Sequence, residues 1–147
     1  MSKQLKIRLS AVKKSDLKFL YRLLREREPI FNISHKKMPS YTQHRKFFIS
    51  KPYSHWYVIY DGNKKIGTAY LSKQNEIGIH IKKGFPPEKI RSAALIALIK
   101  QNPRERYLVN INPRNDKTID FYKKNGFRLI QYTFELLESD LIVEKSN

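Results

Sequence analysis

The chain has 147 residues, of which 40% are hydrophobic and none is cysteine, and 30 Lys and Arg against 13 Asp and Glu give a formal net charge of +17. We expect a single domain over residues 1–147, without thiol nucleophiles, disulfides or zinc–thiolate sites. No apolar run suits a signal peptide or a membrane span, so we expect a cytoplasmic protein. The charge attracts anions, with nucleic acid among the partners it allows, but a lysine-rich surface can also serve solubility alone.

The first fifty residues predict a strand followed by two helices. Apolar and polar residues alternate over residues 5–11, as in a strand, and apolar residues at helical spacing predict a helix over residues 14–28. Ser40 is a suitable N-cap for a second helix that runs through Phe48.

The middle of the chain predicts a hairpin, a strand and a longer helix. Two β-rich runs between residues 56 and 72 flank Asp61-Gly62, which favours a tight turn. Residues 75–81 alternate as a further strand, the fourth in chain order. Residues 88–101 form a helix with an apolar stripe made of Ile90, Ala94, Leu95 and Leu98.

The last third predicts strand, helix and strand. Residues 106–112 read as a strand, and residues 116–125 as a short helix with Gly126 at its left-handed C-terminal position. Residues 127–137 form the next strand, and residues 140–145 a last edge strand. This order predicts an α/β (α+β) fold with a mixed sheet, because hairpins pair antiparallel and a strand–helix–strand unit pairs parallel.

The segment NPRNDKTIDFYKKNGF, residues 112–127, resembles the late motif of the GNAT superfamily of acyl-CoA-dependent N-acetyltransferases. That motif has an Asn, a short helix with an aromatic pair ending in Tyr, and a Gly-Phe, which match Asn115, Phe121-Tyr122 and Gly126-Phe127. With the similar strands upstream, including the small residue Gly67, the resemblance spans residues 56–135. It implies a mostly antiparallel central sheet of six to seven strands with helices on both faces.

The resemblance also implies acetyl-CoA as cosubstrate and an amine of a small molecule or peptide as acceptor. The fourth and fifth strands of such a fold splay apart, so that the backbone of Ile79 and Ile81 meets the cofactor arm. Tyr122 is implied to protonate or hydrogen-bond the departing thiolate, and Asn115 to cap its helix and touch the cofactor. From their spacing alone, Tyr122 can equally be an aromatic residue of the core and Asn115 only a helix cap.

The chain departs from the family at the pyrophosphate loop. The family pattern is Gln or Arg, two residues, Gly, one residue, then Gly or Ala, and it falls on PPEKIR, residues 86–91. Pro86 replaces Gln or Arg, and Lys89 and Arg91 replace the small residues. One expectation is that phosphate binds through basic side chains and the first free amides of the helix, at Lys89, Ile90, Arg91 and Ser92. The alternative is that the cofactor site has been lost.

Acetyl transfer requires a neutral amine, so a base must accept its proton, often through water. The resemblance implies Glu76, at the start of the fourth strand, for this role. Tyr57, Tyr70 and His80 on neighbouring strands are alternatives. His35, His44 and His55 are too scattered for a metal set, and we expect no metal.

We therefore expect an N-acetyltransferase in which the amine attacks the thioester directly, with Tyr122 and Glu76 as catalytic residues. One alternative is a catalytically inactive domain of this fold that binds nucleic acid or another polyanion through its basic surface. Another is a structural subunit of a larger assembly. The sequence is compatible with a monomer or a homodimer.

Overall fold

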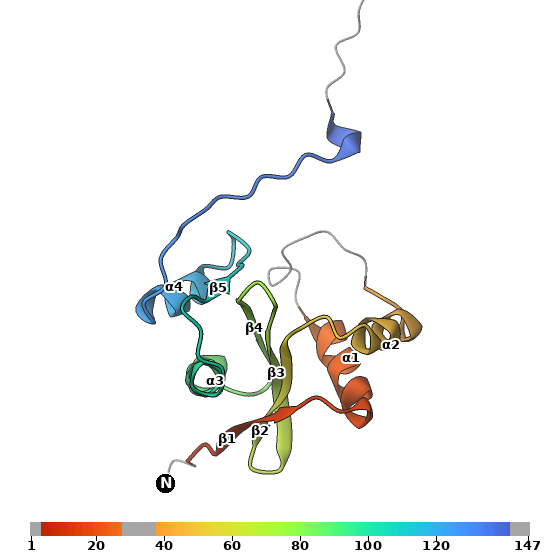
Figure 1. Ribbon diagram of the computed structural model, residues 1–147, viewed down its shortest axis with the longest axis vertical. Helices are drawn as coiled ribbons and strands as arrows, with labels where there is room; N and C mark the ends of the chain where they lie inside the picture. The colour runs from red at the N-terminus through yellow and green to blue at the C-terminus, as the bar shows by residue number, and fades with distance from the viewer. Residues whose placement is uncertain (1–3, 28–37, 142–147) are drawn as a thin grey trace, which may run out of the picture.

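A five-stranded sheet with helices on both faces forms the body of the protein (Figure 1). The computed structural model describes residues 4–27 and 38–141. In this part of the chain the strand order is β1-β2-β3-β4-β5, with antiparallel neighbours except for the parallel pair β4 and β5. The strands are β1 (Ile7–Ala11), β2 (His55–Asp61), β3 (Lys64–Leu71), β4 (Glu76–Ile81) and β5 (Leu108–Val109). The mixed, mostly antiparallel sheet is confirmed, but it has fewer strands than the predicted six to seven.

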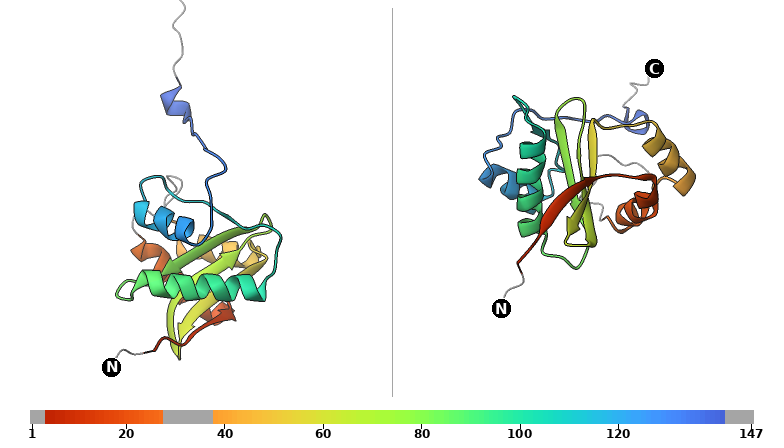
Figure 2. Two further views of the ribbon diagram at one scale, coloured as in Figure 1. Left: turned by 90° about the vertical axis from the view of Figure 1, so that its left-hand side faces the viewer. Right: turned by 60° about the horizontal axis from the view of Figure 1, so that its bottom comes forward.

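The helices form two layers, with α1 and α2 on one face of the sheet and α3 and α4 on the other (Figures 1 and 2). Their bounds are α1 (Leu17–Glu26), α2 (Tyr41–Ile49), α3 (Pro87–Gln101) and α4 (Asp116–Lys124). Short 3-10 turns occupy Lys14–Asp16 and Glu138–Asp140. The four predicted helices are confirmed, although residue 28, the predicted end of the first, lies outside the described residues.

Local signals explain the start of α2 and the packing of α3. The N–H of Gln43 donates to the Ser40 hydroxyl at 3.1 Å, and the Gln43 side chain accepts from the Ser40 N–H, as in a capping box. The predicted apolar stripe of α3 is at most 3% exposed. It packs against two buried clusters on that face of the sheet, one that contains Ile59 and Ile66 and one that contains Leu71 and Ile77. The buried stripe fixes α3 across the strands.

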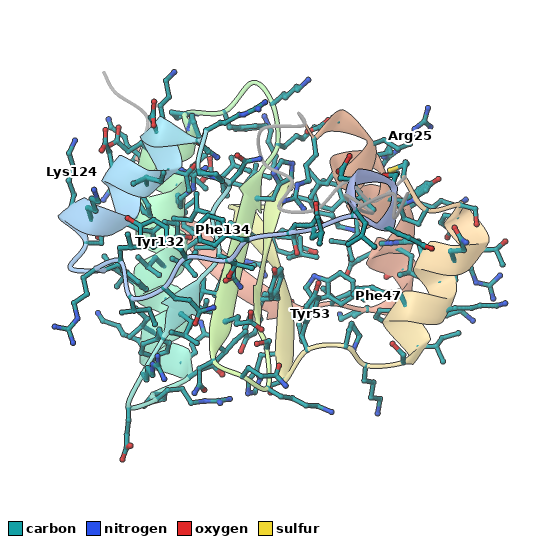
Figure 3. The ribbon with its side chains drawn as sticks, turned by 90° about the horizontal axis from the view of Figure 1, so that it is seen from above. Arg25, Phe47, Tyr53, Lys124, Tyr132 and Phe134 are labelled. Atoms are coloured by element: carbon teal, nitrogen blue, oxygen red, sulfur yellow. The ribbon has the colours of Figure 1, made fainter. Side chains whose placement is uncertain are left out.

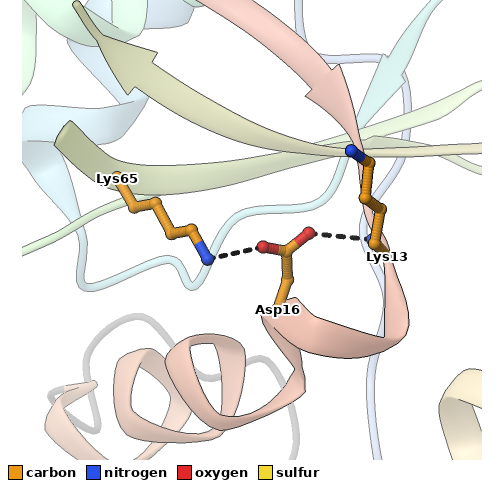
Figure 4. A network of polar contacts seen from close by, with 3 residues as sticks. All are labelled: Lys13, Asp16 and Lys65. Carbon is orange, nitrogen blue, oxygen red and sulfur yellow. Dashed lines mark hydrogen bonds and ion pairs between the residues drawn. The ribbon is translucent and has the colours of Figure 1, made fainter. Parts of the chain in front are cut away.

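A buried carboxylate ties the start of α1 to the sheet. Asp16 is 4% exposed, and its carboxylate accepts from the Lys13 N–H at 2.8 Å and from the Lys65 ammonium of β3 at 2.6 Å (Figure 4). The two bonds satisfy a charge that would otherwise be costly to bury.

A Schellman motif ends α4. Gly126, at φ +90, donates its N–H to the Lys123 carbonyl, and the Phe127 N–H donates to the Tyr122 carbonyl at 3.0 Å. A residue with a β-carbon rarely adopts this φ, which explains the glycine. The turn directs Phe127 back against Tyr122, where the ring centroids are 5.1 Å apart.

The predicted strands of the last third are mostly wrong. Only Leu108–Val109 of residues 106–112 pairs as a strand. Residues 127–137 are extended, pair with no strand of the described chain and, after the half-buried Phe127, are exposed. Residues 140 and 141 are not in a strand, and the rest of the predicted edge strand, 142–145, lies outside the described residues. Alternation shows which segment can form a strand, but a strand also needs an edge to pair with, and that is a non-local property.

Candidate active site

The sheet opens between β4 and β5. These parallel strands pair only where Leu108 and Val109 lie beside the first two residues of β4. Beyond that point, within the described residues, Gly78–Ile81 has no partner on the β5 side. The splay implied by the family resemblance is therefore present.

Backbone groups of β4 face this opening. The Ser72 N–H donates to the Glu76 carbonyl at 2.8 Å, so the even-numbered positions of β4 bond to β3. Because backbone groups alternate in direction along an antiparallel strand, Ile79 and Ile81 turn their N–H and C=O groups toward the gap. Polar backbone groups at such a place are stabilised when a ligand or water bonds them.

Tyr122 lies under this part of the sheet, where α4 packs against α3. Its side chain is 3% exposed, in a cluster with Leu71 and Ile77, and the Phe121 ring is 5.0 Å from its ring. Burial raises the pKa of Tyr122 to about 12; the nearby Arg91 cation opposes this rise and Tyr70 adds to it. The phenol is thus protonated at neutral pH, and Tyr122 is a core residue whose hydroxyl can donate a hydrogen bond.

Arg91 places a cation beside the phenol. Its guanidinium lies 5.3 Å from the centroid of the Phe121 ring, and burial lowers its pKa while Tyr122 and Glu88 raise it. Arginine remains charged under such conditions. Arg91 also lines a cavity of about 270 Å³ at the end of β4, whose other walls are Glu26, His80, Ile81, Lys82, Lys83, Gly84, Phe85 and Pro87.

The first turn of α3 offers fewer free amides than expected. The helix begins at Pro87, which has no N–H, and Ile90 donates to the Pro86 carbonyl at 3.5 Å. Arg91 and Ser92 follow within the helix, so their amides bond to the preceding turn. The unbonded first-turn amides belong to Glu88 and Lys89, and only Lys89 of the four predicted residues keeps such an amide.

Glu76 is held at the mouth of the opening. Its carboxylate accepts a hydrogen bond from the Ser72 hydroxyl at 3.1 Å and another from the side-chain amide of Asn110, the residue directly after β5. This pair of bonds bridges β4 to the chain beyond β5. Glu76 can accept a proton only in competition with these two donors.

An aromatic cluster covers the α1 and α2 face next to Glu76. The Tyr53 and Tyr70 rings stack with centroids 3.9 Å apart, and Tyr53 also meets Trp56 at 5.1 Å and Phe47 at 5.7 Å (Figure 3). Burial raises the pKa of Tyr70; Arg27 opposes that rise and Glu76 adds to it. Burial also raises the pKa of Tyr53, so both phenols are neutral at pH 7, and they lie on the face of the sheet opposite α3.

The two other alternative bases have structural partners. The Tyr57 hydroxyl and the Asn102 side chain at the end of α3 are hydrogen-bonded at 3.1 Å. Burial, together with the nearby cations Arg27 and Arg91, lowers the pKa of His80 to about 4, and a hydrogen bond with the Leu23 backbone acts the other way. His80 is thus neutral at pH 7 and a weak base.

Asn115 is the N-cap of α4. Its side chain is buried and accepts from the Thr118 N–H at 3.2 Å. The capping role accounts for this residue without a ligand, and its contact with a cofactor stays a prediction.

The fold brings Glu76, Ile79, Ile81 and Tyr122 to one opening, with Arg91 beside it. Sequence reasoning missed Tyr53 and Asn110, which no motif marks. Tyr70 was weighed only as a base, yet its position could be predicted, because the short connection between the strands that became β3 and β4 sets Tyr70 opposite Gly78.

Known structures share this architecture, although no protein-family model and no curated protein matches the sequence. A domain from Methanocaldococcus jannaschii has 20% identity and a TM-score of 0.73, over 90% of this chain and 94% of that one. Spermidine N-acetyltransferase from Vibrio cholerae, solved with CoA and spermine, has 19% identity and a TM-score of 0.67, over 82% of this chain and 79% of that one. A ribosomal-protein alpha-N-acetyltransferase in complex with coenzyme A has 19% identity and a TM-score of 0.66, over 85% and 81%.

These similarities show that the chain has the fold of the GNAT N-acetyltransferases, as the sequence resemblance implied. In residues 4–27 and 38–141, no helix is long and apolar enough to cross a membrane. The same residues contain no group of three or more His, Asp or Glu side chains placed to hold a metal ion.

Proposed function

We propose that the protein is an acetyl-CoA-dependent N-acetyltransferase that acts on a primary amine. The observation that carries this proposal is the unpaired edge of β4 at Ile79 and Ile81, next to the protonated phenol of Tyr122. The structural neighbours named above support it, because two of them are N-acetyltransferases solved with coenzyme A.

The residues around the opening fit the parts of acetyl-CoA. The backbone of Ile79 and Ile81 would bond the amide groups of the pantetheine arm, as a further strand would. Arg91, Lys82 and Lys89 would neutralise the phosphates, together with the amides of Glu88 and Lys89 at the start of α3. Basic side chains would thus take over part of the role that glycine amides have in the family loop.

In the reaction, the amine nitrogen would attack the thioester carbonyl, form the C–N bond and displace the thiolate. The backbone N–H of Ile79 would polarise the carbonyl oxygen, and the proton of the amine would pass through water to Glu76. Tyr122 would donate a hydrogen bond to the departing sulfur. Full proton transfer from a phenol of pKa about 12 to a thiolate of ordinary pKa ~8.5 would cost about 5 kcal/mol, so stabilisation by the hydrogen bond is the better description.

The acceptor would enter from the α1 and α2 face, past Glu76 and the stacked Tyr53 and Tyr70. The two rings would form a flat apolar wall for the acceptor, next to the carboxylate of Glu76. The net charge of +17 repels a polycation at a distance and attracts an anion. We therefore expect a neutral or acidic amine, such as a phosphorylated metabolite or an acidic peptide, to be a better acceptor than a polyamine.

Calorimetric titration with acetyl-CoA, followed by a thiol-release assay over a panel of amines, tests the proposal. We expect saturable binding and a raised melting temperature, since a ligand that binds only the folded state stabilises it. Failure of acetyl-CoA to bind or to raise the melting temperature at millimolar concentration would overturn the proposal.

The polyanion-binding alternative depends on the net charge and on the altered pyrophosphate loop, and the structural neighbours give it no support. A titration with single- and double-stranded nucleic acid at two salt concentrations separates it from the enzyme. Binding driven by phosphate contacts alone should weaken steeply with salt, whereas acetyl-CoA binding, which also uses the backbone of β4, should weaken less.

A further inference from the structure

A cavity of about 450 Å³ lies between the last turn of α2 and the start of β2. Its uncharged walls are Val12, Phe48, Ile49, Pro52, Tyr53 and Trp56. Three of these walls are aromatic, and the Tyr53 and Trp56 rings meet edge to face with centroids 5.1 Å apart. The volume is within the range of small-molecule sites, about 300–1,000 Å³. The cavity therefore suits a flat, apolar group such as an aromatic ring.

Lys51 is the remaining described wall of this cavity and its one charged residue. It follows α2 at φ +50, and its N–H donates to the Phe48 carbonyl at 3.1 Å. This left-handed position after a helix usually holds glycine, because a β-carbon is disfavoured there. A lysine kept in an unfavourable conformation beside a cavity indicates a use for its side chain.

The segment around the cavity carries positive charge only. Residues 38–60 contain Arg45, Lys46 and Lys51, all of them exposed, and no Asp or Glu. A carboxylate on a bound ligand would therefore meet cations from this segment and no competing acid. The walls and the charge together fit an aromatic ring that bears a carboxylate.

The cavity and the proposed reaction centre lie along one row of the sheet. Trp56 of β2 is opposite Tyr70 of β3, and Tyr70 is opposite Gly78 of β4. Neighbouring strands are about 4.8 Å apart, so Trp56 and the backbone of Gly78 are separated by roughly 10 Å. The Tyr53 ring, labelled in Figure 3, stacks on Tyr70 between them. A ligand with one end in the cavity can thus place its other end beside Ile79.

We propose that the acceptor carries its amine at one end and an aromatic ring with a carboxylate about 10 Å away, and that this cavity binds the aromatic end. The ring lies among the aromatic walls, and the carboxylate pairs with Lys51. The inference rests on the proposed acetyl transfer for the role of the amine, but occupancy of the cavity can be measured without any reaction.

A short peptide provides a probe with this spacing. In the tetrapeptide amide glycyl-glycyl-phenylalanyl-glutamate, two residue steps of about 3.3 Å and the length of a side chain separate the amine from the ring. Its phenylalanine and glutamate supply the ring and the carboxylate. The matched controls are the same peptide with alanine in place of phenylalanine, and with glutamine in place of glutamate.

Fluorescence of Trp56 is the first test, because it is the only tryptophan of the chain and lines the cavity. The probe peptide should change the emission saturably, and each control peptide should bind about 10-fold more weakly. No saturable change at millimolar concentration, or equal affinity of the three peptides, would overturn the inference. Tighter binding of a short single-stranded oligonucleotide would also overturn it and assign the cavity to nucleobase stacking.

Lys51→Gly separates the use of this side chain from its place in the fold. Glycine suits φ +50, so the melting temperature should not fall, whereas affinity for the probe peptide should fall about 10-fold. Lys51→Arg keeps the charge and should retain the affinity. Ile96→Asp, at a half-exposed apolar position of α3, should bind the peptide normally, whereas Ile49→Asp should not. Unchanged affinity in both Lys51→Gly and Ile49→Asp would contradict the assignment.

Turnover distinguishes this inference from the proposed function. With acetyl-CoA, kcat/KM for the probe peptide should exceed that for the alanine control about 10-fold, and 3-phenylpropionate should compete with the peptide but not with acetyl-CoA. Thiol release with equal kcat/KM for both peptides, or without competition by 3-phenylpropionate, would overturn the inference and leave acetyl transfer standing. Binding at Trp56 without any thiol release would contradict acetyl transfer, and with it the identity of the ligand as an acceptor.

Discussion

The Tyr70 ring occupies the space that a side chain at position 78 would need. A β-carbon at Gly78 would collide with Cε1 and Cζ of Tyr70, the residue opposite it across β3 and β4. The ring cannot simply move aside, because it stacks on Tyr53. Gly78 thereby allows one phenol to lie across β4, on the opposite face of the sheet from Tyr122.

This contact predicts that Gly78→Ala destabilises the protein by about 1–3 kcal/mol, the usual cost of overpacking. Denaturant unfolding measures the effect. In a Tyr70→Ala background the same substitution should cost much less, since the space is then free. Equal costs in the two backgrounds would show that the ring does not limit position 78.

Tyr122→Phe should lower kcat about 10- to 100-fold and leave the KM for acetyl-CoA nearly unchanged. The phenyl ring keeps the packing against Phe121 and Phe127, so only the proposed hydrogen bond to the departing sulfur would be lost. The melting temperature serves as the control and should change little. An unchanged kcat, with the thiol-release step shown to limit turnover, would remove Tyr122 from the mechanism.

His80 should make the protein less stable in mild acid. Its pKa is about 4 when folded, against 6.5 as the ordinary value, so the unfolded chain binds the extra proton first. The free energy of unfolding should therefore fall by about 3 kcal/mol as the pH drops from 6.5 to 4. His80→Gln should lose this part of the pH dependence whatever its stability at pH 7. The same slope in both proteins would contradict the assignment.

Arg91→Met should weaken acetyl-CoA binding about 10- to 100-fold, because the charge-assisted bond to phosphate is lost while most of the apolar length of the side chain is kept. Calorimetry measures this loss. Lys100→Met, at the other end of α3, is the charge-matched control and should bind normally. Acetyl-pantetheine, which lacks the pyrophosphate, should bind the Arg91→Met variant and the unaltered protein equally. An unchanged affinity for acetyl-CoA would place the phosphates elsewhere.

Local signals predicted most of the body. The capping box at Ser40, the apolar stripe of α3 and Gly126 after α4 each depend on neighbours in sequence, and each is present. The same holds for the hairpin of β2 and β3, which the tight turn at Asp61-Gly62 joins as predicted.

Pairing and packing between distant segments could not be read in this way. The alternation of residues 127–137 indicated a strand, but no described edge of its own chain receives it. The bond from Asn110 to Glu76 and the stack of Tyr53 on Tyr70 join residues that only the folded sheet brings together. Which backbone N–H groups of α3 lack a helical partner depends on where the helix begins, and it begins at Pro87. Aligning the sequence with the family motif does not give that boundary.

The central claim is that the gap between β4 and β5 binds the arm of acetyl-CoA. A titration of the ¹⁵N-labelled protein with acetyl-CoA, followed by NMR at low and high salt, tests it most directly. The account predicts saturable shifts and slower hydrogen exchange at the amides of Ile79 and Ile81, with smaller changes at Glu88 and Lys89, and persistence of these effects at high salt. Shifts scattered over the lysine-rich surface that vanish with salt, with no change at Ile79 and Ile81, would contradict it.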